Sequence, residues 1–233
     1  MTMNTVPVNH PPIHVLNEVE SRKILKEYAV PHNKSAFAKT KEETIQEADK
    51  MEFPVVLKVV SPLIVHKSDF GGVQINLQNI QEVEEAFDLI YENAKKRGVV
   101  SNGIEGVIVQ EMIEGKEEIL VGIKRDPIFG PVLVVGLGGV FVELLKDVSL
   151  GIAPLEENEI LNMLKKLKAY PLLNGYRGKE KLDIDALVQL CKKVVDMAIR
   201  EDGILEMDLN PVILREEGKG AIAVDARIVL QEK

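Results

Sequence analysis

The most informative part of the sequence is Ile204-Leu205-Glu206-Met207-Asp208-Leu209-Asn210-Pro211. Side chains alternate between the two faces of a β-strand, so Glu206, Asp208 and Asn210 share one face. Leu205, Met207 and Leu209 share the other. Because apolar residues flank the polar ones, we expect a largely buried strand whose polar face has a function. Carboxylate and amide oxygens suit a hard cation such as Mg²⁺, which takes one or two carboxylates together with substrate phosphates.

A second strand follows and carries Ala223-Val224-Asp225-Ala226-Arg227. The polar residues 215–220 predict a hairpin loop, and the second strand covers 221–230. If Leu214 pairs with Ala221, Asn210 faces Asp225 and Arg227 faces Asp208. Asn210 and Asp225 would then point at one cation. The alternative is a strand pair whose polar residues cover a solvated face.

Composition limits the class of protein. The 233 residues are 45% hydrophobic with a formal net charge of −8, which indicates a globular chain and argues against a general nucleic-acid binder. The single cysteine, Cys191, excludes an internal disulfide framework and occupies an apolar helical position typical of a core. No apolar run is long enough to span a bilayer, and the N-terminus lacks a signal-peptide pattern. We expect a cytoplasmic protein.

Hydrophobic periodicity and capping residues predict the order of elements. Residues 1–16 form an irregular, proline-containing arm, and 17–105 and 106–233 form two units that meet at a hinge near 103–106. The first unit has helices at 17–28, from Thr40 and from Asn79, and strands at 35–38, 54–60 and 72–77. The Thr40 helix begins with a capping box, in which Glu43 reaches back to the Thr40 amide. The second unit has strands at 107–113, 118–124, 130–135, 140–144 and 149–154, helices at 157–168 and 183–200, and the closing strand pair.

Lys58 is the only charge in the apolar strand at 54–60. A buried lysine is costly unless an anion pairs with it. One interpretation is a salt bridge to an acid of the same sheet. The other is a contact with a nucleotide phosphate, for which a compact ammonium is well suited.

Val65-His66-Lys67-Ser68-Asp69-Phe70-Gly71-Gly72-Val73 is a polar loop closed by two glycines. Imidazole can act as a nucleophile and carry a phosphoryl group, whereas a lone histidine is often only structural. Gly136-Leu137-Gly138-Gly139 could hold phosphate with its backbone amides, although no Gly-Lys-Ser/Thr follows as in a P-loop.

Gln110-Glu111-Met112 lies at the end of a predicted strand, just before Glu114-Gly115. Backbone groups at a strand end can accept and donate the two hydrogen bonds that an adenine edge offers. Any strand end would look similar, so this segment has meaning only together with the others.

Taken together, these motifs resemble the ATP-grasp fold, an α+β or α/β fold in which two subdomains clamp a nucleotide. More narrowly, His66-Lys67-Ser68-Asp69 with Gly71-Gly72-Val73 resembles the β subunit of ADP-forming acetyl-CoA synthetase (acetate–CoA ligase), related to that of succinyl-CoA synthetase. The resemblance covers the chain from about residue 17. It implies that Val56 and Lys58, Gln110 to Met112, and Gly138 and Gly139 contact ATP or ADP. It implies Mg²⁺ on Asp208, Asn210 and Asp225, and catalytic roles for His66 and, less directly, Glu206.

The resemblance also implies a reaction, in which acyl-CoA, ADP and phosphate give the acid, CoA and ATP. A separate α subunit would bind CoA and carry a first phosphohistidine, within an α2β2 complex, and His66 would relay the phosphoryl group to ADP. Two alternatives remain. One is another ATP-grasp carboxylate ligase, which has no need of a loop histidine. The other is a nucleotide-binding regulatory module without turnover.

Overall fold

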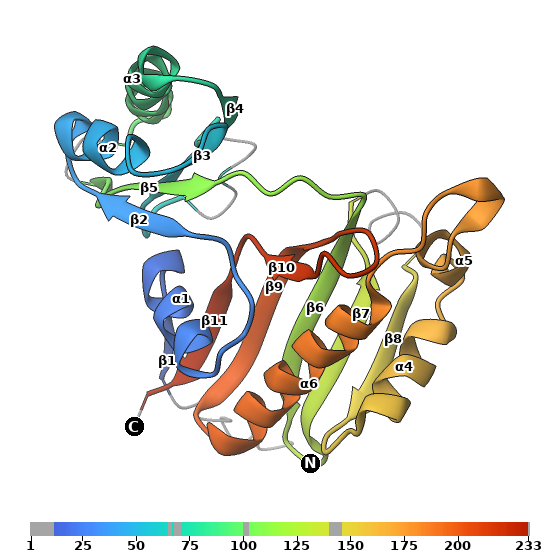
Figure 1. Ribbon diagram of the computed structural model, residues 1–233. Coiled ribbons are helices and arrows are strands. Elements are labelled where there is room, and N and C mark those ends of the chain that lie inside the picture. The colour runs from blue at the N-terminus through green and yellow to red at the C-terminus, as the bar shows by residue number, and fades with distance from the viewer. Residues whose placement is uncertain (1–11, 65–66, 68–70, 100–102, 140–145, 233) are drawn as a thin grey trace, which may run out of the picture.

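The computed structural model describes residues 12–64, 67, 71–99, 103–139 and 146–232. Two antiparallel sheets, each covered by helices, make up this part of the chain (Figure 1). The seven-stranded sheet has the order β1-β11-β9-β6-β7-β8, with β10 paired to β9, and the four-stranded sheet has the order β2-β5-β3-β4. The chain passes from one sheet to the other between α1 and β2 and again between β5 and β6.

The larger sheet holds the C-terminal half of the protein. Its strands are β1 (Ile13–Val15), β6 (Glu117–Asp126), β7 (Gly130–Leu137), β8 (Val148–Ile152), β9 (Ile204–Leu214), β10 (Ala221–Ala223) and β11 (Arg227–Gln231). Helices α4 (Glu157–Lys165) and α6 (Ile184–Arg200) cover one face, and α5 (Tyr170–Leu173) and the turn η3 (Tyr176–Gly178) connect them. Every second side chain of the central strands packs into this core, as Val121, Val135 and Leu209 do. The opposite face of the sheet therefore remains available for a ligand.

The smaller sheet consists of β2 (Ser35–Ala38), β3 (Val55–Val60), β4 (Val73–Leu77) and β5 (Gly106–Glu111), covered by α2 (Lys41–Ala48) and α3 (Ile80–Lys96). Val55, Leu57 and Val59 pack against these helices. The alternation of a strand turns Val56 and Lys58 to the other face. Lys58 thus faces away from the helices of its own sheet.

Side-chain caps begin the predicted N-terminal helices. In α1 (Glu18–Glu27), Asn17 accepts a hydrogen bond from the Glu20 amide at 3.0 Å, and Glu20 accepts one from the Asn17 amide at 2.9 Å. Thr40 caps α2 in the same way. The predicted return bond differs, because Glu43 accepts a hydrogen bond from the Lys39 amide and not from the Thr40 amide. Each cap satisfies amides that the first helical turn leaves without partners.

Strand partners correct three details of the sequence prediction. Residues 13–15 of the predicted arm form β1 and pair with β11. β5 pairs with β2 and β3, so the predicted boundary before residue 106 separates it from its own sheet. We propose that the division between the two units falls within 112–116. The predicted strand 221–230 is broken at 224–226, where the chain leaves β10 before β11 begins.

Two expectations about the class of protein can be compared with the structure. Among the described residues, no helix is both long and apolar enough to cross a membrane. Cys191 is fully buried in α6, and burial raises the pKa of its thiol to about 12. The prediction that this cysteine belongs to the core is confirmed.

Candidate functional site

The two sheets meet through a set of buried and half-buried residues joined by polar contacts, which we call the junction cluster. It consists of Glu18 and Arg22 of α1, Lys58 of β3, Lys67, Gln110 of β5, and Val224 and Asp225 from the break between β10 and β11. In Figure 1, α1 lies beneath the smaller sheet and beside β11. The cluster thus lies where the face of β3 turned away from α2 and α3 approaches the larger sheet.

Lys58 is buried in this cluster with three oxygen partners. Its ammonium donates to the Val224 carbonyl at 2.8 Å and lies 3.4 Å from Asp225 Oδ2 and 3.6 Å from Glu18 Oε1. The sequence predicts an acid of the same sheet or a phosphate as its partner. The observed acids come instead from α1 and from the opposite sheet. The ammonium thus has two carboxylates and one backbone carbonyl around it.

Glu18 was missed by the sequence analysis, although it is the most enclosed charge of the cluster. Its side chain is 2% exposed, and it contacts Arg22 at 3.1 Å and Lys67 at 2.7 Å. Burial raises the pKa of Glu18, but the charges of Lys58, Lys67 and Arg22 outweigh this effect and lower the pKa to about 2. The available signal was the spacing of Glu18, Arg22 and Leu25, which places a Glu–Arg pair on the buried stripe of the helix.

Arg22 binds groups from both sheets. Its guanidinium donates to the Asn33 side chain at 2.9 Å, to Gln110 Oε1 at 2.9 Å and to the Val224 carbonyl at 2.8 Å, in addition to Glu18. A planar guanidinium with five donors can satisfy such a set of acceptors, which an ammonium cannot do in the same geometry. Arg22 is therefore one of the residues that join the two sheets, together with Lys58 and Gln110.

The segment predicted to hold adenine already makes hydrogen bonds within the protein. The Gln110 side chain donates to the Val224 carbonyl at 3.1 Å and is buried. The amide of Glu111 donates to the Lys34 carbonyl at 3.0 Å, and that of Met112 to the Pro54 carbonyl at 3.2 Å. Val56 pairs with Gln110 and is buried beside it. The two amides at the strand end are thus not open donors.

A pocket of about 570 Å³ begins at the end of this segment. Its lining runs from Met112 to Glu118 and includes Ile213 near the end of β9 and Arg215 just after it. Ile213 pairs with Glu118 across β9 and β6. The pocket adjoins the strand that carries Asp208 and Asn210, so one elongated ligand could contact both.

The predicted metal residues lie on β9 and just before β11. Glu206, Asp208 and Asn210 are exposed while Met207 and Leu209 are buried, so the alternation is confirmed but the polar face is more open than expected. Leu214 pairs with Ala221 and Asp208 with Arg227, as predicted. The same register places Asn210 opposite Asp225, at the gap between the two paired stretches.

An irregularity in the sheet adjoins Asn210. Ile119 pairs with Val212 and Val121 with Leu209, so β9 holds one more residue than β6 over this interval. Such a bulge redirects side chains and is frequent beside active sites. Here it lets Ile213, and not Val212, follow Asn210 on the open face, since Val212 is buried.

The carboxylates of this region repel one another. Partial desolvation raises the pKa of Asp208, and the charges of Asp225 and Glu206 raise it further, against the effect of Arg227. Burial and the charge of Glu18 raise the pKa of Asp225, although Lys58 and Lys67 oppose them. Oxygen donors whose negative charges destabilise one another fit a hard divalent cation. Among the described residues, no group of three or more acidic, histidine or cysteine side chains is close enough to hold a metal alone, so Asn210 or ligand oxygens would complete the set.

The remaining predicted site residues make few contacts that bear on their predicted roles. Glu206 lies 3.8 Å from Lys124, with both side chains largely exposed, and its predicted role stays a prediction. The Gly138 amide donates to the Glu118 carbonyl at 2.6 Å, so of the two glycines only Gly139 could offer its amide to phosphate. His66 lies outside the described residues.

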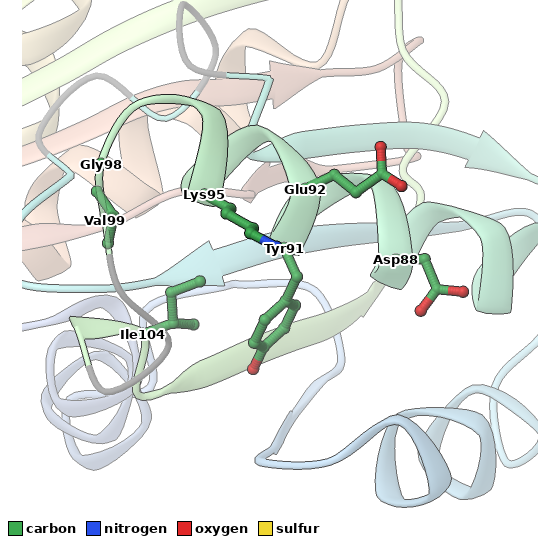
Figure 2. A pocket seen from close by; sticks show the side chains of 7 residues that line it. All are labelled: Asp88, Tyr91, Glu92, Lys95, Gly98, Val99 and Ile104. Carbon is green, nitrogen blue, oxygen red and sulfur yellow. The ribbon is translucent and has the colours of Figure 1, made fainter.

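A second pocket, of about 590 Å³, lies away from all of these residues. Figure 2 shows its lining on α3 and on the segment that follows, with Tyr91, Lys95 and Ile104. None of its lining residues belongs to the junction cluster or to the predicted metal set. We do not include it in the candidate site.

Comparison with known proteins agrees with this geometry. Residues 10–230 match the family described as the ATP-grasp domain. The chain is 43% identical over 215 residues to the β subunit of ADP-forming acetate–CoA ligase I of Pyrococcus furiosus, covering 92% of this chain and 91% of that protein. The predicted fold class is confirmed.

Solved structures give the same result. An acetyl-coenzyme A synthetase of Candidatus Korarchaeum cryptofilum in complex with coenzyme A and Ca-AMPCP has 45% identity and a TM-score of 0.87, with 93% of each chain covered. The same enzyme with coenzyme A and Mg-AMPPCP, its phosphohistidine segment pointing towards the nucleotide-binding site, has 41% identity and a TM-score of 0.80, covering 93% of this chain and 92% of that one. The chain described here therefore belongs to the ATP-grasp family and, within it, to the β subunits of ADP-forming acetate–CoA ligases.

Proposed function

We propose that this chain is the nucleotide-binding subunit of an ADP-forming acyl-CoA synthetase. It binds ADP or ATP with Mg²⁺ and exchanges a phosphoryl group between the nucleotide and a phosphohistidine. The observation that carries the proposal is the junction cluster, which brings the buried ammonium of Lys58 within 3.4 Å of Asp225, one of the predicted metal residues. A cation for phosphate and an oxygen ligand for Mg²⁺ thus share one location.

The nucleotide extends from this location to the pocket at the end of β5. Its base occupies the pocket lined by Met112 to Glu118 and Ile213, and its phosphates extend toward Asp208, Asn210 and Lys58. Because Gln110 is buried in the junction cluster, its contribution is to hold the segment in place. Base contacts come instead from Met112 and the residues after it.

Asp208, Asn210 and Asp225 hold the Mg²⁺ ion, which neutralises charge on the phosphate oxygens when bound. Lys58 adds a second positive charge from the smaller sheet. Most of the catalysis of phosphoryl transfer consists of such positioning and charge stabilisation. The phosphoryl group passes from an imidazole nitrogen to a terminal oxygen of ADP. The N–P bond breaks and leaves its electron pair on nitrogen, and a new P–O bond completes ATP.

The other half of the reaction belongs to a partner. We propose an α subunit that binds CoA and carries the first phosphohistidine, in an α2β2 complex in the cytoplasm, where ADP and CoA are available. The P. furiosus relative is named a β subunit, which implies such a partner for that protein. His66 would relay the phosphoryl group, so that each transfer occurs between groups held close together. Glu206 could help to orient the phosphorylated imidazole.

The test uses the purified chain with Mg²⁺ and γ-labelled ATP, with and without its α subunit, and detects acid-labile, base-stable label. We expect label on this chain that His66→Ala abolishes and that the exposed control His14→Ala retains. Lys58→Gln should weaken ADP binding about tenfold or more in calorimetry, whereas Lys50→Gln, in the turn after α2, should not. ADP binding without any label on this chain would remove the relay and favour another ATP-grasp ligase or a nucleotide sensor.

A further inference from the structure

The two oxygens of the Glu18 carboxylate bind different lysines. Oε2 lies 2.7 Å from the Lys67 ammonium, and Oε1 lies 3.6 Å from that of Lys58. Arg22 also binds Oε1, with both Nε and Nη2 at 3.1 Å, and so fixes the orientation of the carboxylate. Glu18 therefore holds two ammonium groups from separate segments on either side of one buried carboxylate.

The backbone of Lys67 is also hydrogen-bonded. Its carbonyl accepts a hydrogen bond from the Gly72 amide at 2.8 Å, and the Gly71 carbonyl accepts hydrogen bonds from Asn93 and Gln74 at 3.2 and 3.1 Å. Gly71 has φ +71°, a backbone conformation that favours glycine, and a Cβ there would lie 2.6 Å from Asn93 Nδ2. Gly71 is thus bound to α3 through Asn93, and Lys67 to α1 through Glu18.

The charges of the junction cluster do not cancel. Two carboxylates, Glu18 and Asp225, lie among the three cations Arg22, Lys58 and Lys67. Lys67 is 22% exposed, so it is the cation of the three that solvent, and hence a ligand, can reach most easily. A phosphoryl group beside Lys58 and Lys67 would supply the negative charge that the cluster lacks.

We propose that Glu18 is a positioning residue for phosphoryl transfer. It holds Lys67 next to Lys58, so that both ammonium groups contact the phosphoryl group during its transfer. The inference rests on the proposed function and adds to it a residue outside the predicted site. Glu18 itself is not a ligand of the nucleotide. Its removal should therefore slow transfer without weakening nucleotide binding, since Lys58 loses a competing anion.

The experiment measures the exchange of labelled ADP into ATP by the complex with its α subunit, because this exchange reports the nucleotide half-reaction alone. ADP affinity is measured on the same samples by calorimetry. The variants are Glu18→Gln, Lys67→Gln, the double variant, and Glu27→Gln as a control for the same charge change at an exposed position of the same helix. Lys67→Gln alters a loop side chain and tests the inference even if Glu18→Gln does not fold.

We expect each single variant to slow exchange about tenfold or more at saturating ADP. ADP affinity should be unchanged or tighter in Glu18→Gln, which removes the anion beside Lys58. The double variant should be no slower than the slower single variant, because both substitutions break one contact. Lys67→Arg should recover part of the rate, since it restores the ion pair. Wild-type rates in Lys67→Gln, or additive losses in the double variant, would overturn the inference while leaving the proposed function intact. A wild-type complex that binds no ADP would overturn both.

Discussion

Arg22 Nη2 lies 2.9 Å from Gln110 Oε1 and 2.8 Å from the carbonyl oxygen of Val224, so one side chain of α1 is bonded to both sheets. The three residues come from sequence positions separated by 88 and 114 residues. The relative placement of the nucleotide-binding elements therefore depends on a buried polar contact as well as on the two apolar cores.

Replacing Arg22 with methionine should destabilise the protein strongly. The substitution leaves the Glu18 carboxylate and the Val224 carbonyl with fewer partners in a buried place, and breaking one side of a buried ion pair costs about 3–5 kcal/mol. Urea denaturation of the isolated chain measures the free energy of unfolding. Lys50→Met, which removes an exposed pair with Glu47, should change it by less than about 1 kcal/mol. Equal effects of the two substitutions would contradict a structural role for the Arg22 network.

Glu18 should make the stability of the protein depend on acid pH. Its pKa is lowered from 4.5 to about 2, so the folded state favours the ionised carboxylate more than the unfolded state does. This stabilisation is complete above the unfolded pKa and is lost as the pH falls from about 4.5 toward 2. The difference in unfolding free energy between the wild type and Glu18→Gln should thus be largest near about pH 7 and shrink by about pH 3. Glu27→Gln should show no such trend; a constant difference for Glu18→Gln would refute the ion-pair explanation.

The sequence alone predicts the strand pair and its register well. Alternation of polar and apolar residues in 204–210 and the length of the polar loop determine that Leu214 pairs with Ala221, and Asp208 with Arg227. Both signals are local, so they can be interpreted without knowledge of the rest of the fold. The break in the second strand around Asp225 was not predicted.

The junction cluster could not be predicted in the same way. Glu18, Lys58 and Asp225 come from a helix, a strand of the smaller sheet and the break between β10 and β11, and no periodicity within one segment reports their proximity. The boundary before β5 was misplaced for a related reason, since strand partners and not chain order decide which sheet a strand joins. Lys58 was correctly identified as requiring an anion, because a lone charge in an apolar strand carries that information by itself.

The thiol of Cys191 should not react with thiol reagents in the native protein. Its thiol is fully buried in α6, and burial raises its pKa to about 12, so almost no thiolate forms near about pH 8. A thiol reagent such as Ellman's should release no colour from the folded chain and one equivalent after denaturation. Rapid reaction under native conditions would show that α6 opens, because no other cysteine is present.

Asp208→Asn should make the metal-free protein more stable, although it should damage the site. Desolvation and the charges of Asp225 and Glu206 raise the pKa of Asp208, so the ionised carboxylate destabilises the folded state. This cost is absent well below pH 3.8, appears as the pH rises through 3.8 and is complete above the raised pKa. In EDTA near about pH 7, the melting temperature of the variant should be equal to or higher than that of the wild type.

The same variant should gain less from its ligand. Mg²⁺ with ADP stabilises a protein in proportion to its affinity for the folded state, and the neutral amide that replaces the Asp208 carboxylate would lack the charge that favours the cation. We therefore expect a smaller rise in melting temperature on adding Mg²⁺ and ADP to Asp208→Asn than to the wild type. Asp202→Asn, at an exposed position before β9, should show the full rise. A variant that is less stable in EDTA and responds normally to Mg²⁺ and ADP would place the metal elsewhere and give Asp208 a structural role.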